Sequence, residues 1–375
     1  MKIEVMIYVY LAICVGMIAF NITSTVLSRV NDKRMVRVSD GFDEIILENL
    51  RLLEKTGIVE DKHKHYLVKK LKRIGNFRAF DMALEQEYEK KPELVKQYLQ
   101  SMGSTFTYLT ICYRKRDPVE TAYFPYIMKK YEILNGRPFD AMIDMLYSLL
   151  SEPSIYCREN ALQAIYTIGD ADCVIRALKI IDAQNKFYHS KLLTDGLLTF
   201  MGNKESLGDA LWEFYPEASG DMKITILNYF RFSNVRYCER FYDIMTDEKC
   251  DDEIRFSCIR YFGKCYYDKA YPVLLDFARG QNELRWEYSA IASIALGTYP
   301  TDETIQVLKV NLHNSNWYIR FNASQSLERI GLTYSDLIDI VEGKDRYASE
   351  ILRYRFDVRD IMEDEKGAAA VCLKY

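Results

Sequence analysis

A short segment recurs six times in the second half of the chain, and this period constrains the fold more than any other feature. The copies begin 33, 32, 32, 31 and 34 residues apart. They are Arg158–Gly169, Lys191–Gly202, Lys223–Asn234, Arg255–Tyr266, Trp286–Gly297 and Arg320–Gly331. A period of about 20 to 50 residues is typical of chains built from stacked structural units.

The pattern inside each copy has the spacing of a helix. Apolar residues stand at offsets seven and ten in most copies, as with Ile165 and Ile168, and this places them on one helical face. Four copies end on glycine, a natural helix stop because glycine adopts the left-handed conformation easily. At offset three the residue is mostly small, and the six residues there are Ala161, Thr194, Ile226, Cys258, Ser289 and Ala323.

A second amphipathic stretch follows each copy. Examples are Cys173–Ile181, Ala270–Ala278 and Glu303–Leu312. One repeat is therefore a helical hairpin, which cannot bury its apolar face alone. Because stacked neighbours complete the core, we expect an all-α fold, a curved α-solenoid.

The pattern R-x-x-A-x-x-A-I-x-x-I-G-D at Arg158–Asp170 resembles the second helix of a HEAT repeat of the short, phycobilisome-lyase type. Arg320–Gly331 matches in the same way, and the resemblance covers roughly residues 150–341. The copies at Lys223 and Arg255 depart from it, because they lack the final glycine and carry aromatic residues. The resemblance implies that the R-x-x-A helices line a concave face and that the common role is protein binding.

An apolar segment at the N-terminus predicts a transmembrane helix over residues 3–27. No charge occurs from Val5 to Phe20, and about 20 residues at ~1.5 Å each cross a ~30 Å hydrocarbon layer. A cleaved signal peptide fits less well, because Lys2 and Glu4 cancel and no A-x-A site follows. A buried core helix fits less well too, because the run has no polar face.

Charges after this span predict its orientation. The basic residues there are Arg29, Lys33, Arg34 and Arg37. Asp32 and Asp40 oppose them only in part, and the N-terminal side has no net side-chain charge. Because positive residues stay on the cytoplasmic side, we expect the N-terminus outside and the body in the cytoplasm. The nine cysteines contain no CxxC pair, which favours reduced thiols in the same compartment.

Residues 28–150 and 342–375 flank the repeats. The first region reads as helical, with breaks near Pro92, Asp117-Pro118 and Gly136-Arg137-Pro138; it is either degenerate repeats or an N-terminal helical cap. A partial copy occurs at Lys64–Gly75. In the second region we expect a charged capping helix over Arg346–Asp360 and a loose tail.

A basic run lies at residues 62–73. Its membrane-proximal candidates are Lys69, Lys70, Lys72 and Arg73. It is either an exposed helix face or a surface that contacts anionic lipid heads, each charge adding ~1 kcal/mol. Nucleic acid is not expected as a partner, since the net charge is −4 and no basic stripe continues along the repeats.

Chemical motifs are missing from the sequence. His63 and His65 are the closest pair of histidines, and solvated helix-start residues explain them better than metal ligands. We find no phosphate-binding glycine loop and no G-x-S-x-G elbow. Cys258 takes the small core position. We therefore expect no catalytic residues, no metal and no cofactor.

The expected binding surface consists of polar residues at offsets two, five and eight or nine of the repeat helices. They are Asn160, Gln163, Asn228, Arg231, Arg260, Lys264, Asn322 and Gln325. Together with the anchor they predict a membrane-tethered, cytoplasm-facing scaffold for a protein partner, with a membrane enzyme or its regulator as the candidate. The alternatives are a lyase-like HEAT-repeat enzyme and a sensor that binds a small ligand.

Overall fold

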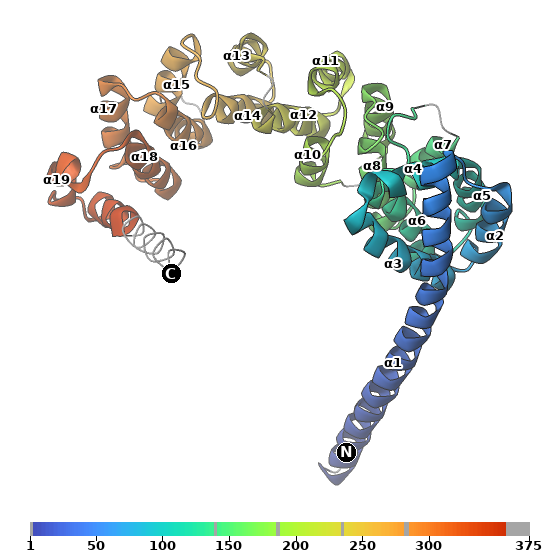
Figure 1. Ribbon diagram of the computed structural model, residues 1–375. Helices are drawn as coiled ribbons and strands as arrows, with labels where there is room; N and C mark the ends of the chain where they lie inside the picture. The colour runs from blue at the N-terminus through green and yellow to red at the C-terminus, as the bar shows by residue number, and fades with distance from the viewer. Residues whose placement is uncertain (1–2, 139–140, 185–187, 234–235, 281–284, 358–375) are drawn as a thin grey trace, which may run out of the picture. The chain divides into compact units, whose positions relative to one another are not determined.

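The computed structural model describes residues 3–138, 141–184, 188–233, 236–280 and 285–357 (Figure 1). Within these ranges the regular structure is helical throughout, and no strand occurs. The expected all-α class is confirmed. The chain divides into two compact units, residues 1–184 with 200–203 and residues 185–199 with 204–375.

The first helix, α1 (Ile3–Thr56), has two halves in different surroundings. In the first half the apolar side chains are exposed, as with Tyr8 at 71% and Phe20 at 72%. In the second half Phe42, Ile46 and Leu50 are buried, and this half packs on α3 (Ile74–Lys90) and α4 (Pro92–Ser101). Of the helices described, α1 is the one long and apolar enough to cross a membrane. It continues past Leu27 without a break.

The first unit, called the N-terminal unit below, contains α1 to α9. The remaining helices are α2 (Asp61–Leu71), α5 (Gly103–Tyr113), α6 (Pro118–Lys130), α7 (Met142–Leu149), α8 (Ile155–Tyr166) and α9 (Ala171–Asp182). The predicted breaks coincide with helix ends. Pro92 and Pro118 each open a helix, where proline is tolerated because the first turn leaves its N–H groups unpaired.

Large aromatic side chains fill the core of the N-terminal unit. Phe77, Phe106, Tyr113 and Phe124 are all at most 1% exposed. Tyr113 stacks on Phe124 with ring centroids 5.7 Å apart, and Phe77 lies 5.5 Å from Tyr113. These rings join α3, α5 and α6, so the helices are held by contacts between distant parts of the sequence.

The second unit, called the C-terminal unit, contains α10 to α19. Its helices are α10 (Ser190–Leu198), α11 (Lys204–Phe214), α12 (Gly220–Phe232), α13 (Cys238–Thr246), α14 (Asp252–Phe262), α15 (Ala270–Arg279), α16 (Trp286–Ala295), α17 (Asp302–Asn311), α18 (Trp317–Ile330) and α19 (Ile338–Val341). Short 3-10 turns lie at η1 (Tyr215–Glu217), η2 (Leu296–Thr298) and η3 (Tyr334–Leu337).

The even-numbered helices of this unit form a row. α10, α12, α14, α16 and α18 each pack against the next, while α11, α13, α15 and α17 lie along the other side (Figure 1). Each of the six predicted repeat segments falls on a helix, α8 or a member of this row. The three predicted second stretches fall on α9, α15 and α17. α15 packs on α16 and α17 packs on α18, so these two amphipathic stretches pair with the repeat helix that follows each of them.

The position at offset three is buried in every copy, as its small residues suggest. Ala161, Cys258 and Ala323 are 0% exposed, and Thr194 is 2% exposed. Even Ile226, the largest residue at this position, is fully buried. The burial of this position in every copy agrees with the register read from the sequence.

Glycine ends the repeat segments for two different reasons. Gly169 and Gly331 have φ angles of +79° and +101°, in the left-handed region that we expected. Gly202 and Gly297 do not have a positive φ. A Cβ on Gly202 would meet the carbonyl oxygen of Gly169 at 2.1 Å. There the small residue is required by close packing of two turns, so the predicted left-handed stop is wrong for Gly202 and Gly297.

The C-terminal segment is helical where the structure describes it. Residues 346–357 are α-helical, which agrees with the expected capping helix. Leu352 is fully buried and Phe356 is 4% exposed, so the segment covers the end of the row. The predicted tail, residues 358–375, lies outside the described residues.

Candidate functional site

The arginine that opens several repeat helices serves the fold. Arg158 donates from Nη1 to the carbonyls of Glu152 and Pro153, at 2.9 and 3.0 Å. Arg320 makes the same bonds five and six residues back, at 2.9 and 2.6 Å. Arg255 donates from Nε to the carbonyl of Met245 at 3.0 Å. Carbonyls at the end of a helix or turn lack intrahelical donors, so these arginines fasten each repeat to the preceding turn.

Two predicted binding residues, Asn160 and Asn322, also hold helices together. The Nδ2 group of Asn160 donates to the carbonyl of Ala122 in α6, at 2.9 Å. Asn322 donates in the same way to Ala290 in α16, at 2.7 Å. Both side chains are half-buried. Because their amide donors are engaged between neighbouring helices, these residues contribute to stacking.

Three further predicted residues lie half-buried on the repeat helices. Gln163 donates from Nε2 to the carboxylate of Glu159, at 3.0 Å. Asn228 and Gln325 are also half-buried, and the structure assigns neither side chain a hydrogen bond. Their amides are therefore more accessible for a partner than those of Asn160 and Asn322.

Of the remaining three predicted residues, Arg231 on α12 and Lys264 just after α14 line one pocket, and Arg260 on α14 lies near it. We call this place the basic pocket. It has a volume of about 420 Å³. Its lining comprises Phe230, Arg231, Phe232, Ser233, Arg236, Tyr261, Lys264 and Cys265. The guanidinium of Arg260 lies close enough to Arg231 to lower the pKa of Arg231.

Several positive charges lie close together at the basic pocket, and some of them lower the pKa of a neighbour. Burial and the neighbouring Arg260 lower the pKa of Arg231. Burial lowers the pKa of Arg260, and burial, Arg231 and Arg329 lower the pKa of Lys264. Glu253 opposes this effect at Arg260. Among the described residues, no carboxylate forms an ion pair with Arg231, Arg260 or Lys264.

An exposed aromatic ring borders these cations. Phe232 is 47% exposed. The Nζ atom of Lys264 lies 4.1 Å from the centre of its ring, and the guanidinium carbon of Arg231 lies 5.1 Å away. Attraction to the ring offsets part of the repulsion between the cations. The pocket therefore presents positive charge beside an apolar face.

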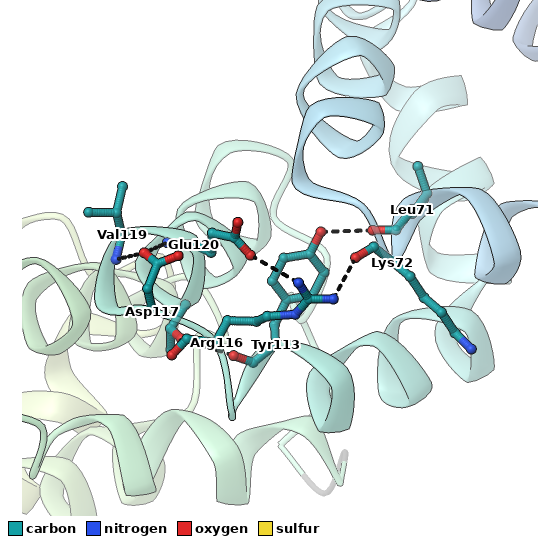
Figure 2. Close-up of polar contacts among 8 residues, drawn as sticks. Leu71, Lys72, Tyr113, Arg116, Asp117, Val119 and Glu120 are labelled. Carbon is teal, nitrogen blue, oxygen red and sulfur yellow. Dashed lines mark hydrogen bonds and ion pairs between the residues drawn. The ribbon is translucent and has the colours of Figure 1, made fainter.

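A second basic region lies on the N-terminal unit, and we call it the basic surface. The predicted residues Lys69, Lys70, Lys72 and Arg73 lie at the end of α2, and a later segment of the same charge lies beside them. The later residues are Arg114, Lys115 and Arg116. Figure 2 shows the link, in which Arg116 donates to the carbonyl of Lys72 at 3.1 Å.

Two more bonds hold the segments of the basic surface in register. The hydroxyl of Tyr113 donates to the carbonyl of Leu71 at 2.8 Å (Figure 2). Asp117 accepts from the backbone N–H groups of Val119 and Glu120 and so caps α6. The turn between α5 and α6 is thereby fixed against the end of α2. The basic residues of the α1 flank, Arg29, Lys33, Arg34 and Arg37, are all exposed.

The described ranges hold no group of three or more His, Cys, Asp or Glu residues that could bind a metal ion. His63 is buried and its Nε2 atom lies 2.6 Å from the hydroxyl of Tyr98. It is therefore a core residue and not the solvated helix-start residue that we expected. Burial raises the pKa of Cys258 well above its usual range and that of Cys173 to about 11, which keeps both thiols protonated.

Sequence reasoning missed several residues at these two places. Arg236 and Phe232 belong to the basic pocket, and the run Arg114-Lys115-Arg116 belongs to the basic surface. The triplet of charges was visible in the sequence. Its position beside Lys72, which is more than 40 residues away in the chain, was not.

No protein-family model matches the chain, and no curated protein matches it in sequence. The two basic regions are therefore interpreted from their geometry alone.

Proposed function

We propose that this chain is a membrane-anchored scaffold whose α-solenoid of HEAT-type repeats binds a protein partner in the cytoplasm. The observation that carries the proposal is the construction of α1. No described residue of its apolar first half is buried, while its second half is part of a packed core. A water-soluble surface rarely shows so long an apolar stretch, and such surfaces mark membrane or protein contacts.

The orientation follows from the charges beside the span. Arg29, Lys33, Arg34 and Arg37 are exposed on the same helix just after the apolar half. Positive residues next to a membrane helix favour the cytoplasmic side. The repeats then face the cytoplasm, and the N-terminus lies outside.

The basic surface supports a second contact with the bilayer. It carries seven lysine and arginine residues from two segments of the chain, with Ile111 exposed nearby at 66%. Anionic lipid heads attract such a surface by ~1 kcal/mol per charge close to the membrane.

The row of repeat helices is the proposed partner surface. Asn228, Gln325 and the residues of the basic pocket are accessible on it, whereas the R-x-x-A arginines and Asn160 and Asn322 hold the helices together. Aromatic and arginine side chains dominate protein interfaces, because they combine contact area with directional hydrogen bonds. A lyase-like activity or a sensor role has no comparable support.

The test uses the full-length protein in native membranes. A photo-activatable amino acid replaces Asn228 or Gln325 on the row, and as a matched control replaces Asp302 or Glu303, which are exposed on α17. We expect one discrete partner band from the row positions and none from the control positions. We also expect the protein to resist an alkaline wash and a reporter after Tyr375 to be cytoplasmic.

Two results would contradict the proposal. Release of the protein by the alkaline wash would contradict the proposed membrane anchor. Equal cross-linking from the row and from α17 would contradict the proposed partner surface.

A further inference from the structure

The basic pocket differs from the other places where the C-terminal unit part-buries arginine. Arg355 pairs with the carboxylate of Glu328, with Nε at 2.8 Å from Oε2. Arg255 donates to a carbonyl and lies over the ring of Tyr288. The buried Nε atoms of Arg231 and Arg320 both have no hydrogen-bond partner. Arg320 still donates from Nη1 to two carbonyls, whereas the structure assigns the guanidinium of Arg231 no hydrogen bond.

Gathering these cations is unfavourable without a counter-charge. Arg231 and Arg260 come from two neighbouring repeats and are half-buried, and the exposed Lys264 lies close enough to Arg231 for the charges to interact. Like charges at close range destabilise one another, and burial strengthens the repulsion. Natural structures satisfy most buried polar groups, so an unsatisfied donor calls for an explanation. An anion bound in the pocket would supply the missing acceptor and the missing charge.

The size and lining of the pocket indicate what kind of anion fits. At about 420 Å³ it is as large as small-molecule sites, which commonly span about 300 to 1,000 Å³. It therefore has room for an oxyanion and for part of the group that carries it. Phe232 and Tyr261 supply apolar contact beside the charges.

The kind of cation favours phosphate over carboxylate. The planar fork of arginine donates two parallel hydrogen bonds to phosphate or carboxylate oxygens. Lys264 adds a point charge, and a phosphoryl group carries about −1.5 to −2 at neutral pH. A single carboxylate would leave two of the three cations uncompensated. A phosphoryl group balances more of them and offers more acceptor oxygens.

We infer that the basic pocket is a binding site for a phosphoryl group, held by Arg231 and Lys264, with the charge of Arg260 beside them and Phe232 at its edge. Two sources share this chemistry, a phosphorylated side chain on the bound partner and a free phosphate compound. The inference deepens the proposed function. It rests on that function only if the phosphoryl group belongs to the bound partner. With the second source, the chain would bind its ligand whether or not a partner is present.

The test measures binding of small probes to the full-length protein in a phosphate-free detergent. The probes are inorganic phosphate, N-acetyl-phosphoserine amide and N-acetyl-serine amide, at constant ionic strength. Broadening of the ³¹P line reports binding of inorganic phosphate and of the phosphoserine compound. Added N-acetyl-serine amide shows whether the unphosphorylated compound competes with them. We expect saturable binding of at least one phosphorylated probe and no competition by the serine compound. The tighter probe identifies the source.

Variants separate the pocket from general attraction to positive charge. R231Q/R260Q/K264Q should weaken binding of the phosphorylated probe at least tenfold. K249Q/K344Q/R346Q removes the same number of charges at exposed positions of the same unit, and should change binding less than twofold. Because repulsion is relieved, the pocket variant should melt no lower than the wild type. If the triple variant does not fold, the single variant K264Q replaces it in the binding measurement.

Absence of saturable binding, or equal weakening in both triple variants, would overturn the inference. These outcomes differ from failure of the proposed function. A pocket variant that loses phosphate but keeps its photo-cross-linked partner supports the inference and excludes the partner as source. If the wild type binds phosphate but gives no cross-linked partner band, the result contradicts the proposed scaffold function and does not contradict the phosphoryl site.

Discussion

Different residues pack the short helices in the N-terminal unit and in the last repeats of the C-terminal unit. In the N-terminal unit large aromatic rings join the helices, and Asp81 accepts hydrogen bonds from the hydroxyls of Tyr123 and Tyr131, both at 2.6 Å. Lys130 pairs with the same carboxylate at 2.8 Å. In the last repeats of the C-terminal unit, small polar residues do this work.

The polar residues of the last repeats form a buried chain of hydrogen bonds. Ser289 and Asn311 both donate to the carbonyl of Ala278, at 2.8 and 2.9 Å. Ser326 donates to the carbonyl of Ser293 in the preceding repeat, at 2.7 Å. Small side chains let helices approach closely at a constant spacing. Aromatic rings pack the earlier repeats of the same unit, as where Trp212 stacks on Phe230 with centroids 4.9 Å apart, and the period continues through both regions.

The largest expected effect concerns the aromatic core. Phe77 is fully buried among Tyr113, Tyr123 and Phe124. Phe77→Ala should destabilise the N-terminal unit by about 3–5 kcal/mol, because it leaves a cavity between three rings. Hydrogen exchange followed by mass spectrometry should show faster exchange in α3, α5 and α6.

The control for this change is Tyr347→Ala, since Tyr347 is 66% exposed. It should leave exchange in the N-terminal unit unchanged. If Phe77→Ala accelerates exchange equally in α16 and α18, the two units do not have separate cores.

A medium effect is expected where helices approach at the small position. Ala161→Leu and Ala323→Leu should each cost about 1–3 kcal/mol, because extra methyl groups do not fit a packed interface. Both sites are fully buried, so the costs should be similar in the two units. Thermal melts by circular dichroism and local hydrogen exchange measure them.

Half-buried positions on the same helices provide the comparison. Gln163→Leu and Gln325→Leu should change the melting temperature little, because these side chains stand at the surface. A melt of Ala323→Leu equal to that of the wild type would show that the repeat register is wrong in the C-terminal unit.

The smallest effect is a pH dependence specific to the N-terminal unit. Burial lowers the pKa of His63 to about 4, from 6.5. The unfolded chain therefore binds a proton at higher pH than the folded chain, and stability is lost as pH falls from about 6.5 towards 4. We expect a slope below about 1 kcal/mol per pH unit, since the ring is partly screened.

His63→Gln should flatten this slope in a series of denaturant unfolding curves, whereas His65→Gln, at an exposed position, should keep it. An unchanged slope in His63→Gln would assign the pH dependence to other groups. The C-terminal unit should show no corresponding change in its local exchange.

The local features of this protein follow from its sequence. Helix periodicity, proline and glycine act within a few residues, so the repeat helices, the opening of helices at Pro92 and Pro118 and the stops at Gly169 and Gly331 were predictable. The apolar start of α1 was predictable for the same reason, because composition and length alone define it.

Distances between helices were decided by the tertiary structure. Sequence offsets placed Asn160 and Arg231 on the same nominal face, but packing turned the first towards Ala122 and left the second beside Arg260 and Lys264. Likewise, only folding brings Arg116 to Lys72. The reason is physical: an offset within a helix gives the direction of a side chain, whereas its partner depends on how closely two helices approach, which the side chains between them determine together.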